Sequence, residues 1–272
     1  MRLGYLGPAG TFSEEAARCA PDAGDAELVA LRTVRDTVMA VHEGSVERAI
    51  VPIENSLEGP IGVTLDTLAE EHDVTIVGEL VLAVSPCLIA REAIERVVSH
   101  PQPLAQCARF LRDRLPAAEV VAVASTAEAV RIVASQDAPW AALGTRRAAE
   151  IYGATVLADG TEDEPGNATR FVWLARTPAP PDPSRPCKTS LAFWGAGDAS
   201  PGWLVRCLSE FAFRGVNLTK IESRPLRAQL GHYRFFVDCE GDARESPVAD
   251  AVAGLRVHCE RVRVLGSYPV ER

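Results

Sequence analysis

The chain has 272 residues, of which 47% are hydrophobic and 24% charged, a composition typical of a soluble globular protein with one large or two medium domains. A total of 28 lysines and arginines against 37 aspartates and glutamates gives a formal net charge of −9, which argues against nucleic acid or an anionic membrane as the main partner. The seven cysteines include no C-x-x-C pair, and no signal peptide or membrane-spanning apolar run is present, so we expect a cytoplasmic protein with reduced thiols.

The first 176 residues alternate short apolar runs with amphipathic segments. The apolar runs predict strands at residues 2–6, 27–31, 48–53, 74–89, 96–99, 119–124, 140–143, 155–157 and 171–175. The amphipathic segments predict helices at residues 13–19, 34–43, 64–71, 103–115, 127–135 and 146–152. This alternation is typical of βαβ units, so we expect an α/β domain with mostly parallel sheets. The long run 74–89 indicates a strand that crosses between two lobes.

A proline-rich segment, residues 177–187, reads as a stiff linker, because its five prolines fit neither a helix nor a central strand. Beyond this linker the pattern changes. Strands are predicted at residues 189–194, 216–222, 233–239 and 257–265, and helices at residues 203–214 and 248–255. The resulting order is βαββαβ, which is the ferredoxin-like unit.

The tripeptide Thr169-Arg170-Phe171 begins the last predicted strand of the first part. A strand end is rigid, so it can aim side chains at a ligand. A guanidinium such as that of Arg170 can bind a carboxylate through two hydrogen bonds, and the Thr169 hydroxyl can donate a hydrogen bond to a leaving oxygen. On its own, the tripeptide is weak evidence for a site, because a surface arginine between two residues at the edge of the core gives the same pattern.

Two loops that precede predicted helices are suited to bind anions. The loop 7–13 is rich in glycine, which lets backbone N–H groups approach an anion at the helix N-terminus. The loop 124–130 places Ser125 before another helix start. Both loops also fit a purely structural capping box, formed by Thr11 with Glu14 and by Ser125 with Glu128.

A third loop, residues 51–62, groups the carboxylate, amide and hydroxyl of Glu54, Asn55 and Ser56 at the end of a strand. Ligands of α/β folds bind at such strand ends, although an asparagine and a serine there can also serve only the turn backbone. The histidines His42, His72 and His100 lack metal-ligand spacing, so no metal site is expected.

Taken together, these loops resemble prephenate dehydratase, and the last part of the chain resembles an ACT regulatory domain. The segments that carry the resemblance are GPAGTFS (7–13), VPIENSLEGPIG (51–62), SHPQPLAQC (99–107), STAEAV (125–130), AALGTRRAAEIYG (141–153), GNATRF (166–171) and RGVNLTKIESRP (214–225). They occur in the order of the family and cover essentially the whole chain.

The resemblance implies a two-lobed α/β catalytic domain, similar to periplasmic binding proteins, at residues 1–176, with its second lobe at roughly residues 79–158. Residues 188–272 would form the ACT domain. The implied reaction converts prephenate to phenylpyruvate, water and carbon dioxide, without a metal or redox cofactor because aromatisation drives it. The implied partners are phenylalanine as feedback inhibitor and further copies of the chain, in a dimer or tetramer joined through ACT domains.

The resemblance also implies roles for individual residues. Thr169 takes the leading catalytic role. The implied substrate-binding residues are Thr11, Ser13, Glu54, Asn55, Ser56, Ser125, Thr126, Arg170 and Phe171. The implied effector-binding residues are Gly202, Trp203, Leu204, Val205, Asn217, Leu218, Glu222, Ser223, Arg224 and Pro225.

The chain departs from the family pattern where effector binding is expected. Trp203 stands where the family usually has an alanine, and the preceding segment 195–201 is about two residues longer than usual. Three alternatives remain: arogenate as the substrate, a related decarboxylation of prephenate, or a non-catalytic protein that senses amino acids.

Overall fold

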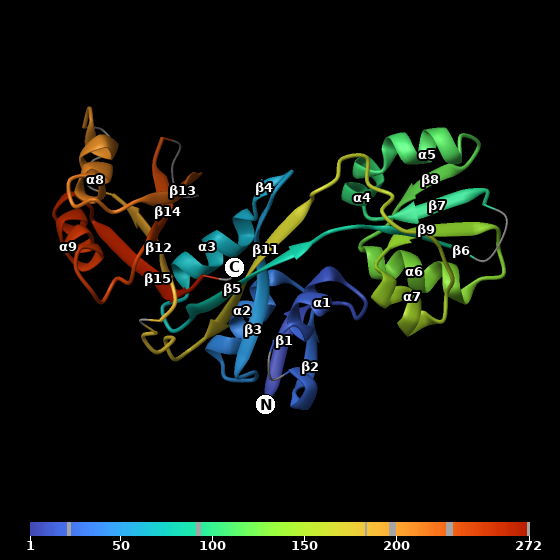
Figure 1. Ribbon diagram of the computed structural model, residues 1–272, viewed down its shortest axis with the longest axis horizontal. Coiled ribbons are helices and arrows are strands. Elements are labelled where there is room, and N and C mark those ends of the chain that lie inside the picture. The colour runs from blue at the N-terminus through green and yellow to red at the C-terminus, as the bar shows by residue number, and fades with distance from the viewer. Residues whose placement is uncertain (21–22, 91–93, 183, 196–199, 227–230, 271–272) are drawn as a thin grey trace.

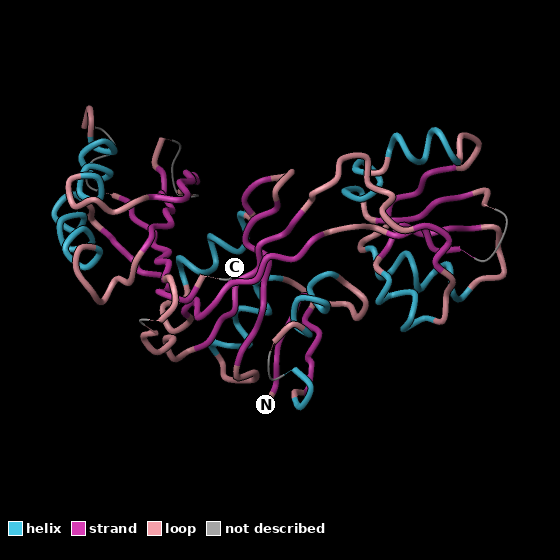
Figure 2. The backbone as a smooth tube through the Cα atoms, in the orientation of Figure 1, coloured by secondary structure: helices cyan, strands magenta, loops and turns pink. Residues whose placement is uncertain are grey.

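The computed structural model describes residues 1–20, 23–90, 94–182, 184–195, 200–226 and 231–270. The described strands form three sheets, which lie in a row along the long axis of the molecule (Figures 1 and 2). Hydrophobic clusters fill the interior of each sheet-and-helix unit. No helix in these described ranges is long and apolar enough to span a membrane.

The first sheet lies at the centre of the molecule, and together with its helices we call it the first lobe (Figure 1). Its strands, in spatial order, are β2 (Glu27–Leu31), β1 (Arg2–Leu6), β3 (Arg48–Asn55), β11 (Ala168–Ala175) and β5 (Thr75–Ala83), with β4 (Gly59–Pro60) paired to β3. Its helices are α1 (Phe12–Arg18), α2 (Val34–His42) and α3 (Gly62–Glu70), and the 3-10 helix η1 (Ala23–Asp25) follows α1.

The second sheet lies at one end of the molecule and forms the second lobe (Figure 1). Its strands, in spatial order, are β10 (Val156–Ala158), β6 (Cys87–Ala90), β9 (Trp140–Gly144), β7 (Arg96–Ser99) and β8 (Glu119–Ala122). Its helices are α4 (Pro101–Gln106), α5 (Ala108–Arg114), α6 (Thr126–Ser135) and α7 (Arg146–Tyr152).

Both sheets are mixed, so the expectation of mostly parallel sheets is wrong. In the first lobe β1 runs parallel to β2 and β3, but β11 returns from the second lobe and inserts antiparallel between β3 and β5. In the second lobe β6 is antiparallel to both β9 and β10. In the first lobe the reason is that the chain leaves for the second lobe through β5 and returns through β11, so these two strands of the central sheet run in opposite directions.

Two predicted elements are each split in the structure. The run 74–89 forms β5 and β6, which belong to different sheets and so do cross between the lobes; Pro86 lies in the break, and proline cannot donate to a strand ladder. The predicted helix 103–115 forms α4 and α5. The predicted helix is interrupted between α4 and α5, where the Asp163 carboxylate accepts hydrogen bonds from Arg109 N (2.7 Å) and Phe110 N (2.9 Å). These bonds cap the start of α5 as a separate helix.

The third sheet lies at the other end of the molecule and, with its two helices, forms what we call the C-terminal unit (Figure 1). Its order along the chain is β12 (Cys187–Trp194), α8 (Trp203–Ala212), β13 (Leu218–Pro225), β14 (Tyr233–Glu240), α9 (Val248–His258) and β15 (Arg261–Pro269), which matches the predicted βαββαβ pattern. The antiparallel strands lie in the order β13-β14-β12-β15.

The two faces of the C-terminal sheet have different partners. Leu191 and Phe193 of β12 pack against α8 and α9, whereas the intervening Ala192 belongs to the core of the first lobe. Leu265 of β15 also joins that core, and its carbonyl oxygen accepts a hydrogen bond from Thr75 Oγ1 of β5 at 2.9 Å. The C-terminal unit therefore shares a hydrophobic core with the first lobe, although the segment 177–187 separates the two parts in the sequence.

Candidate active site

A cavity of about 420 Å³ lies between the two lobes. Its walls come from the loops after β1 and β2, the end of β3 with β4, the start of β11, the helix α4 and the start of α6. Of the residues singled out in the sequence, those that line it are Thr11, Ser13, Asn55, Ser125, Thr126, Thr169 and Phe171. The structure thus gathers segments that lie as far apart in the chain as Leu6 and Phe171, which is why no single motif defines the site.

Thr169 and Asn55 form the centre of this cavity wall. The register of β11 against β3 sets Thr169 opposite Asn55, and Asn55 Nδ2 donates to Thr169 Oγ1 at 3.0 Å. Both residues are buried, with exposed fractions of 8% and 5%. Because the amide donates to the oxygen of the hydroxyl, the threonine proton remains available for donation to a ligand.

Asn55 is itself held in place by the turn that follows β3. Its Oδ1 accepts hydrogen bonds from Leu57 N (3.0 Å) and Glu58 N (3.1 Å). This is the local turn role that the sequence left open, and it coexists with the contact to Thr169. The turn therefore fixes the amide orientation that directs the Thr169 hydroxyl.

A chain of amide side chains connects this centre to the second lobe. Asn55 Nδ2 also lies 2.8 Å from Asn167 Oδ1, and Asn167 Nδ2 donates to Gln106 Oε1 at 3.1 Å. Gln106 lines the cavity, and its Nε2 is buried without a hydrogen-bond partner in the described ranges. A buried unpaired donor is costly, so Gln106 Nε2 is suited to donate to a bound ligand.

The two predicted capping residues do cap their helices. Thr11 Oγ1 accepts from Glu14 N at 3.3 Å, and Ser125 Oγ accepts from Glu128 N at 3.0 Å. In a complete capping box the glutamate carboxylate would accept a hydrogen bond from the backbone N–H of the capping residue. Here the Glu14 carboxylate instead accepts from Gly10 N (2.5 Å), and the Glu128 carboxylate pairs with an arginine of its own helix. Each helix start therefore reaches the cavity with its cap already satisfied.

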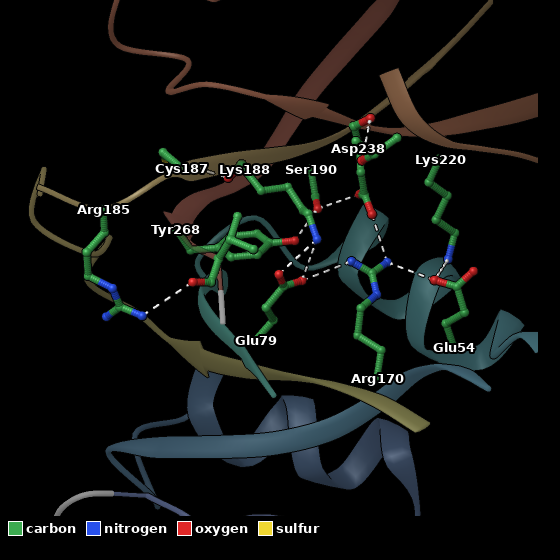
Figure 3. A network of polar contacts seen from close by, with 12 residues as sticks. Glu54, Glu79, Arg170, Arg185, Cys187, Lys188, Ser190, Lys220, Asp238 and Tyr268 are labelled. Carbon is green, nitrogen blue, oxygen red and sulfur yellow. Dashed lines mark hydrogen bonds and ion pairs between the residues drawn. The ribbon is translucent and has the colours of Figure 1, made fainter. Parts of the chain in front are cut away.

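Arg170 does not line this cavity, which corrects the expectation that it holds a substrate carboxylate. Successive side chains of a strand point to opposite faces, so Thr169 and Arg170 cannot both face the same side. The Arg170 guanidinium lies 2.7 Å from Asp238 Oδ2, 3.1 Å from Glu54 Oε2 and 3.2 Å from Glu79 Oε2 (Figure 3). It therefore points to the C-terminal unit.

These ion pairs belong to a network that joins the first lobe to the C-terminal unit. Lys188 Nζ of β12 lies 2.8 Å from both Glu79 carboxylate oxygens, and Lys220 Nζ of β13 lies 3.0 Å from Glu54 Oε2 (Figure 3). Asp238 Oδ1 also accepts from Ser190 Oγ at 2.6 Å. The network alternates carboxylates of Glu54, Glu79 and Asp238 with cations, so its formal charges cancel.

The network also fixes the charge state of Arg170. Burial alone would lower the pKa of the guanidinium, but Asp238, Tyr268 and Glu54 outweigh it, so that pKa is raised above its ordinary value. Arg170 is thus permanently cationic and already paired, which leaves no charge for a ligand.

Glu54 and Ser56 also lie outside the cavity lining. Glu54 points into the network, on the opposite side of β3 from Asn55. Ser56 Oγ accepts from Ala168 N at 3.0 Å and so joins the turn after β3 to the start of β11. Both expectations of direct substrate contact are therefore corrected. Of Glu54, Asn55 and Ser56, Asn55 alone is among the described residues that line the cavity.

Further polar residues line the cavity without having been singled out as candidates: Arg32, Glu58, His100, Gln102 and Gln106. His100, Gln102 and Gln106 fall in the segment 99–107, so their signal was present. Arg32 lies in no recognised motif; it reaches the site only because β2 pairs in parallel with β1. No cluster of three or more potential metal ligands occurs among the described residues.

Comparison with known proteins identifies the family of the chain. A model of the family described as prephenate dehydratase matches residues 3–179. The chain belongs to the prephenate dehydratase family.

Individual relatives of the family agree over nearly the full length. A prephenate dehydratase of Amycolatopsis methanolica is 42% identical, over 98% of this chain and 88% of that protein. An arogenate dehydratase 5 (chloroplastic) of Arabidopsis thaliana is 38% identical, over 100% of this chain and 68% of that protein. The crystal structure of an Arthrobacter aurescens prephenate dehydratase in complex with L-Phe has a TM-score of 0.91 and 38% identity, and the match covers 99% of this chain and 90% of that one.

The effector residues expected from this family do not converge on one site within the described part of a single chain. Gly202, Trp203, Leu204 and Val205 line a shallow hollow at the start of α8, and Asn217 lines a separate hollow near the end of β14. Of the remaining candidates, on the edge strand β13, none lines either hollow: these are Leu218, Glu222, Ser223, Arg224 and Pro225.

Two of these effector candidates have structural partners instead. Arg224 forms a bidentate pair with the Asp66 carboxylate of α3, with Nε–Oδ1 and Nη2–Oδ2 distances of 2.9 Å. Trp203 is buried at 5% exposure, packs against Phe193 and Phe235, and donates from Nε1 to His258 O at 2.6 Å. The indole of Trp203 therefore fills the core of the C-terminal unit and also borders the hollow at the start of α8.

Proposed function

We propose that this protein is an active prephenate dehydratase, converting prephenate to phenylpyruvate, carbon dioxide and water in the cavity between its lobes. The observation that carries the proposal is the buried Thr169 hydroxyl, which borders the cavity and receives a hydrogen bond from Asn55 on its oxygen. That arrangement presents a directed O–H donor, which a leaving hydroxyl group requires.

The reaction breaks two bonds of the substrate ring. The bond from the ring to its carboxylate breaks to release carbon dioxide, and its electron pair enters the ring as the bond to the opposite hydroxyl breaks. The departing hydroxide takes up one proton, which the solvent supplies, and leaves as water. Aromatisation supplies the driving force, so this chemistry needs neither a redox nor a metal cofactor.

Thr169 would assist the departure of that hydroxide. A threonine hydroxyl is too weak an acid for full proton donation, so we assign it a hydrogen bond to the departing oxygen, which strengthens as negative charge develops there. Phe171 on the same face would contact the ring, and Gln106 Nε2 would donate a further hydrogen bond to the substrate.

Arogenate is the second candidate substrate, because the cavity also contains a carboxylate. Glu58 lines the cavity beside the Asn55 turn, and it could pair with the ammonium group that arogenate carries in place of a keto oxygen. The Arabidopsis relative bears the name of that activity. A pure amino-acid sensor is less well supported, since binding alone would not need the Thr169 hydroxyl directed by Asn55.

We also propose that residues 1–176 form the catalytic domain, with a second lobe at roughly residues 79–158, and that residues 188–272 form an ACT regulatory domain after the linker 177–187. Phenylalanine would act as feedback inhibitor through this domain, between ACT domains of a homodimer or homotetramer. Support comes from the βαββαβ order of the C-terminal unit and from the L-Phe bound to the Arthrobacter protein. The dispersal of the effector candidates within one chain fits a site completed by a second copy.

The decisive experiment compares prephenate and arogenate with purified protein, and measures phenylpyruvate and phenylalanine formation. Turnover of prephenate that Thr169→Val largely removes is the expected result. Turnover of arogenate alone would establish the second candidate. If the folded protein converts neither substrate but binds an amino acid, the non-catalytic alternative holds. Addition of phenylalanine to the same assay tests the regulatory proposal, and sedimentation analysis tests the oligomer.

A further inference from the structure

Arg32 occupies an unusual place among the residues that line the cavity. It directly follows β2, and the adjacent Leu31 accepts a hydrogen bond through its carbonyl oxygen from Gly7 N at 2.8 Å. This contact brings the end of β2 against the loop 7–11, which forms one wall of the cavity. Arg32 is thereby carried to the cavity rim by backbone pairing and not by any recognised motif.

The Arg32 side chain has no competing partner. In the described ranges it forms no hydrogen bond and no ion pair, and no other lysine or arginine lines the cavity. By contrast, Arg35, three residues further along, lies within 3.6 Å of Glu70 and 3.5 Å of Glu71. Arg170 is likewise neutralised by three carboxylates.

We propose that Arg32 binds the carboxylate that the substrate retains in the product and that it thereby contributes to substrate affinity. The proposal rests on the function proposed above. A dianionic substrate approaches a chain with a formal net charge of −9, so it requires a local cation. Arg32 supplies that charge in a fork that matches a carboxylate.

The chemistry distinguishes which carboxylate Arg32 should hold. The ring carboxylate loses its charge as carbon dioxide forms, so a cation beside it would stabilise the ground state more than the transition state and slow the reaction. The side-chain carboxylate keeps its charge throughout. A cation beside that group binds substrate and transition state equally, which lowers KM and leaves kcat unchanged. Prephenate and arogenate share this retained carboxylate.

The test compares Arg32→Ala and Arg32→Lys with the matched control Arg35→Ala, which removes a nearby exposed arginine outside the cavity. Because Arg32 is exposed and its charge is screened, we expect the KM of Arg32→Ala for the turned-over substrate to rise roughly 10- to 30-fold, with kcat within twofold. Arg32→Lys should fall between wild type and Arg32→Ala, because an ammonium keeps the charge without the fork. Arg35→Ala should match wild type.

A second measurement uses phenylpyruvate, which carries the retained carboxylate and lacks the one that leaves. Calorimetric affinity for phenylpyruvate should weaken in Arg32→Ala by about the same factor as KM. A raised KM with unchanged phenylpyruvate affinity would instead assign Arg32 to the leaving carboxylate and overturn the proposal. A KM within twofold of wild type in Arg32→Ala would also overturn it.

These results separate failure of the inference from failure of the proposed function. If wild-type protein turns over prephenate or arogenate and Arg32→Ala matches it, only the role of Arg32 fails. If wild-type protein turns over neither substrate, the proposed function fails. In that case unchanged phenylpyruvate affinity in Arg32→Ala would reject the Arg32 site as well, whereas weakened affinity would retain it as an anion site.

Discussion

Thr169 and Arg170 are adjacent on β11, yet their side chains serve opposite faces of the central sheet. Thr169 borders the cavity between the lobes, while Arg170 forms ion pairs that reach Asp238 of the C-terminal unit at 2.7 Å. The partners of these two residues on β3 alternate in the same way, since Asn55 contacts Thr169 and Glu54 contacts Arg170. On each of these two strands, therefore, a residue at the cavity is the direct neighbour in sequence of a residue that forms an ion pair with the C-terminal unit.

This arrangement predicts that Thr169→Val loses turnover far more than substrate affinity. The substitution keeps the shape of the side chain and removes the O–H donor to the departing oxygen. Loss of one such transition-state hydrogen bond costs on the order of 3 kcal/mol, or about a hundredfold in kcat. Steady-state kinetics measures both parameters, and Thr169→Ser, which restores the hydroxyl, should recover most of kcat. Near-normal turnover by Thr169→Val would reject the catalytic assignment.

A second prediction concerns the direction of the Thr169 hydroxyl. In Asn55→Asp the side chain can still accept from Leu57 N and Glu58 N, but it can no longer donate to Thr169 Oγ1. A carboxylate would instead accept the threonine proton and turn it away from the substrate. We therefore expect kcat to fall by about a hundredfold, with far-UV circular dichroism unchanged. Unaltered kcat in the folded variant would show that Asn55 does not orient the hydroxyl.

Arg170→Lys is expected to affect stability more than substrate binding, because Arg170 lies outside the cavity. A lysine retains one charge but cannot contact Glu54, Glu79 and Asp238 together, so buried carboxylates lose partners. We expect a loss of about 1–3 kcal/mol in the free energy of unfolding, with KM within twofold. Urea denaturation and kinetics measure the two effects. Arg131→Lys, at an exposed pair with Glu128, serves as control and should change stability by less than ~0.5 kcal/mol.

The sequence predicted the strands well wherever a short run of apolar residues had clear limits. The ranges 2–6 and 27–31 match β1 and β2, because each is a short apolar run bounded by polar or turn residues. Prediction was poorer where distant segments decide the outcome. The helix 103–115 is split by Asp163, and the direction of β11 depends on the route of the chain through the second lobe.

Among the residues that line the cavity, the sequence predicted the hydroxyl side chains and Asn55, but neither the amides of Gln102 and Gln106 nor the charged side chains of Arg32 and Glu58. The alternation of side chains along a strand already implies that Thr169 and Arg170 face opposite sides of the sheet, so one cavity cannot bind both. Arg32 is different. Its position depends on the pairing of β2 with β1 and on the contact of Leu31 with Gly7, neither of which leaves a local pattern in the sequence.

The buried thiols predict a loss of stability at alkaline pH. Burial raises the pKa of Cys107 to about 11, and that of Cys87 and Cys239 to about 12. An unfolded thiol titrates near pH ~8.5, so above this pH the unfolded state releases protons that the folded state keeps. This contribution to stability is therefore complete below pH ~8.5 and is lost as pH rises towards the folded values.

Urea denaturation at pH 7.5 and pH 9.5 measures this effect. Each of the three thiols of Cys87, Cys107 and Cys239 should account for about 1 kcal/mol of the decrease in unfolding free energy between these pH values. Cys239→Ala removes one of these thiols, so its stability should depend less on pH by about that amount. An identical pH dependence in wild type and Cys239→Ala would show that the buried thiol does not titrate on unfolding.

The last prediction concerns the contact between β15 and β5. Gly266 on β15 packs so closely on β5 that a Cβ atom there would stand 2.1 Å from the carbonyl oxygen of Ile76. Because that oxygen belongs to the backbone, Gly266→Ala must move one strand away from the other and open the core that Leu265 shares with the first lobe. Such overpacking typically costs ~1–3 kcal/mol, which thermal denaturation would detect as a lower Tm.

Gly24→Ala is the matched control, since a Cβ at Gly24 meets no atom within 4 Å. A wild-type Tm in Gly266→Ala would show that the C-terminal unit does not depend on this contact. A lower Tm with a single transition would show that the C-terminal unit and the first lobe unfold together, so removal of the residues after Arg176 would also destabilise the two lobes.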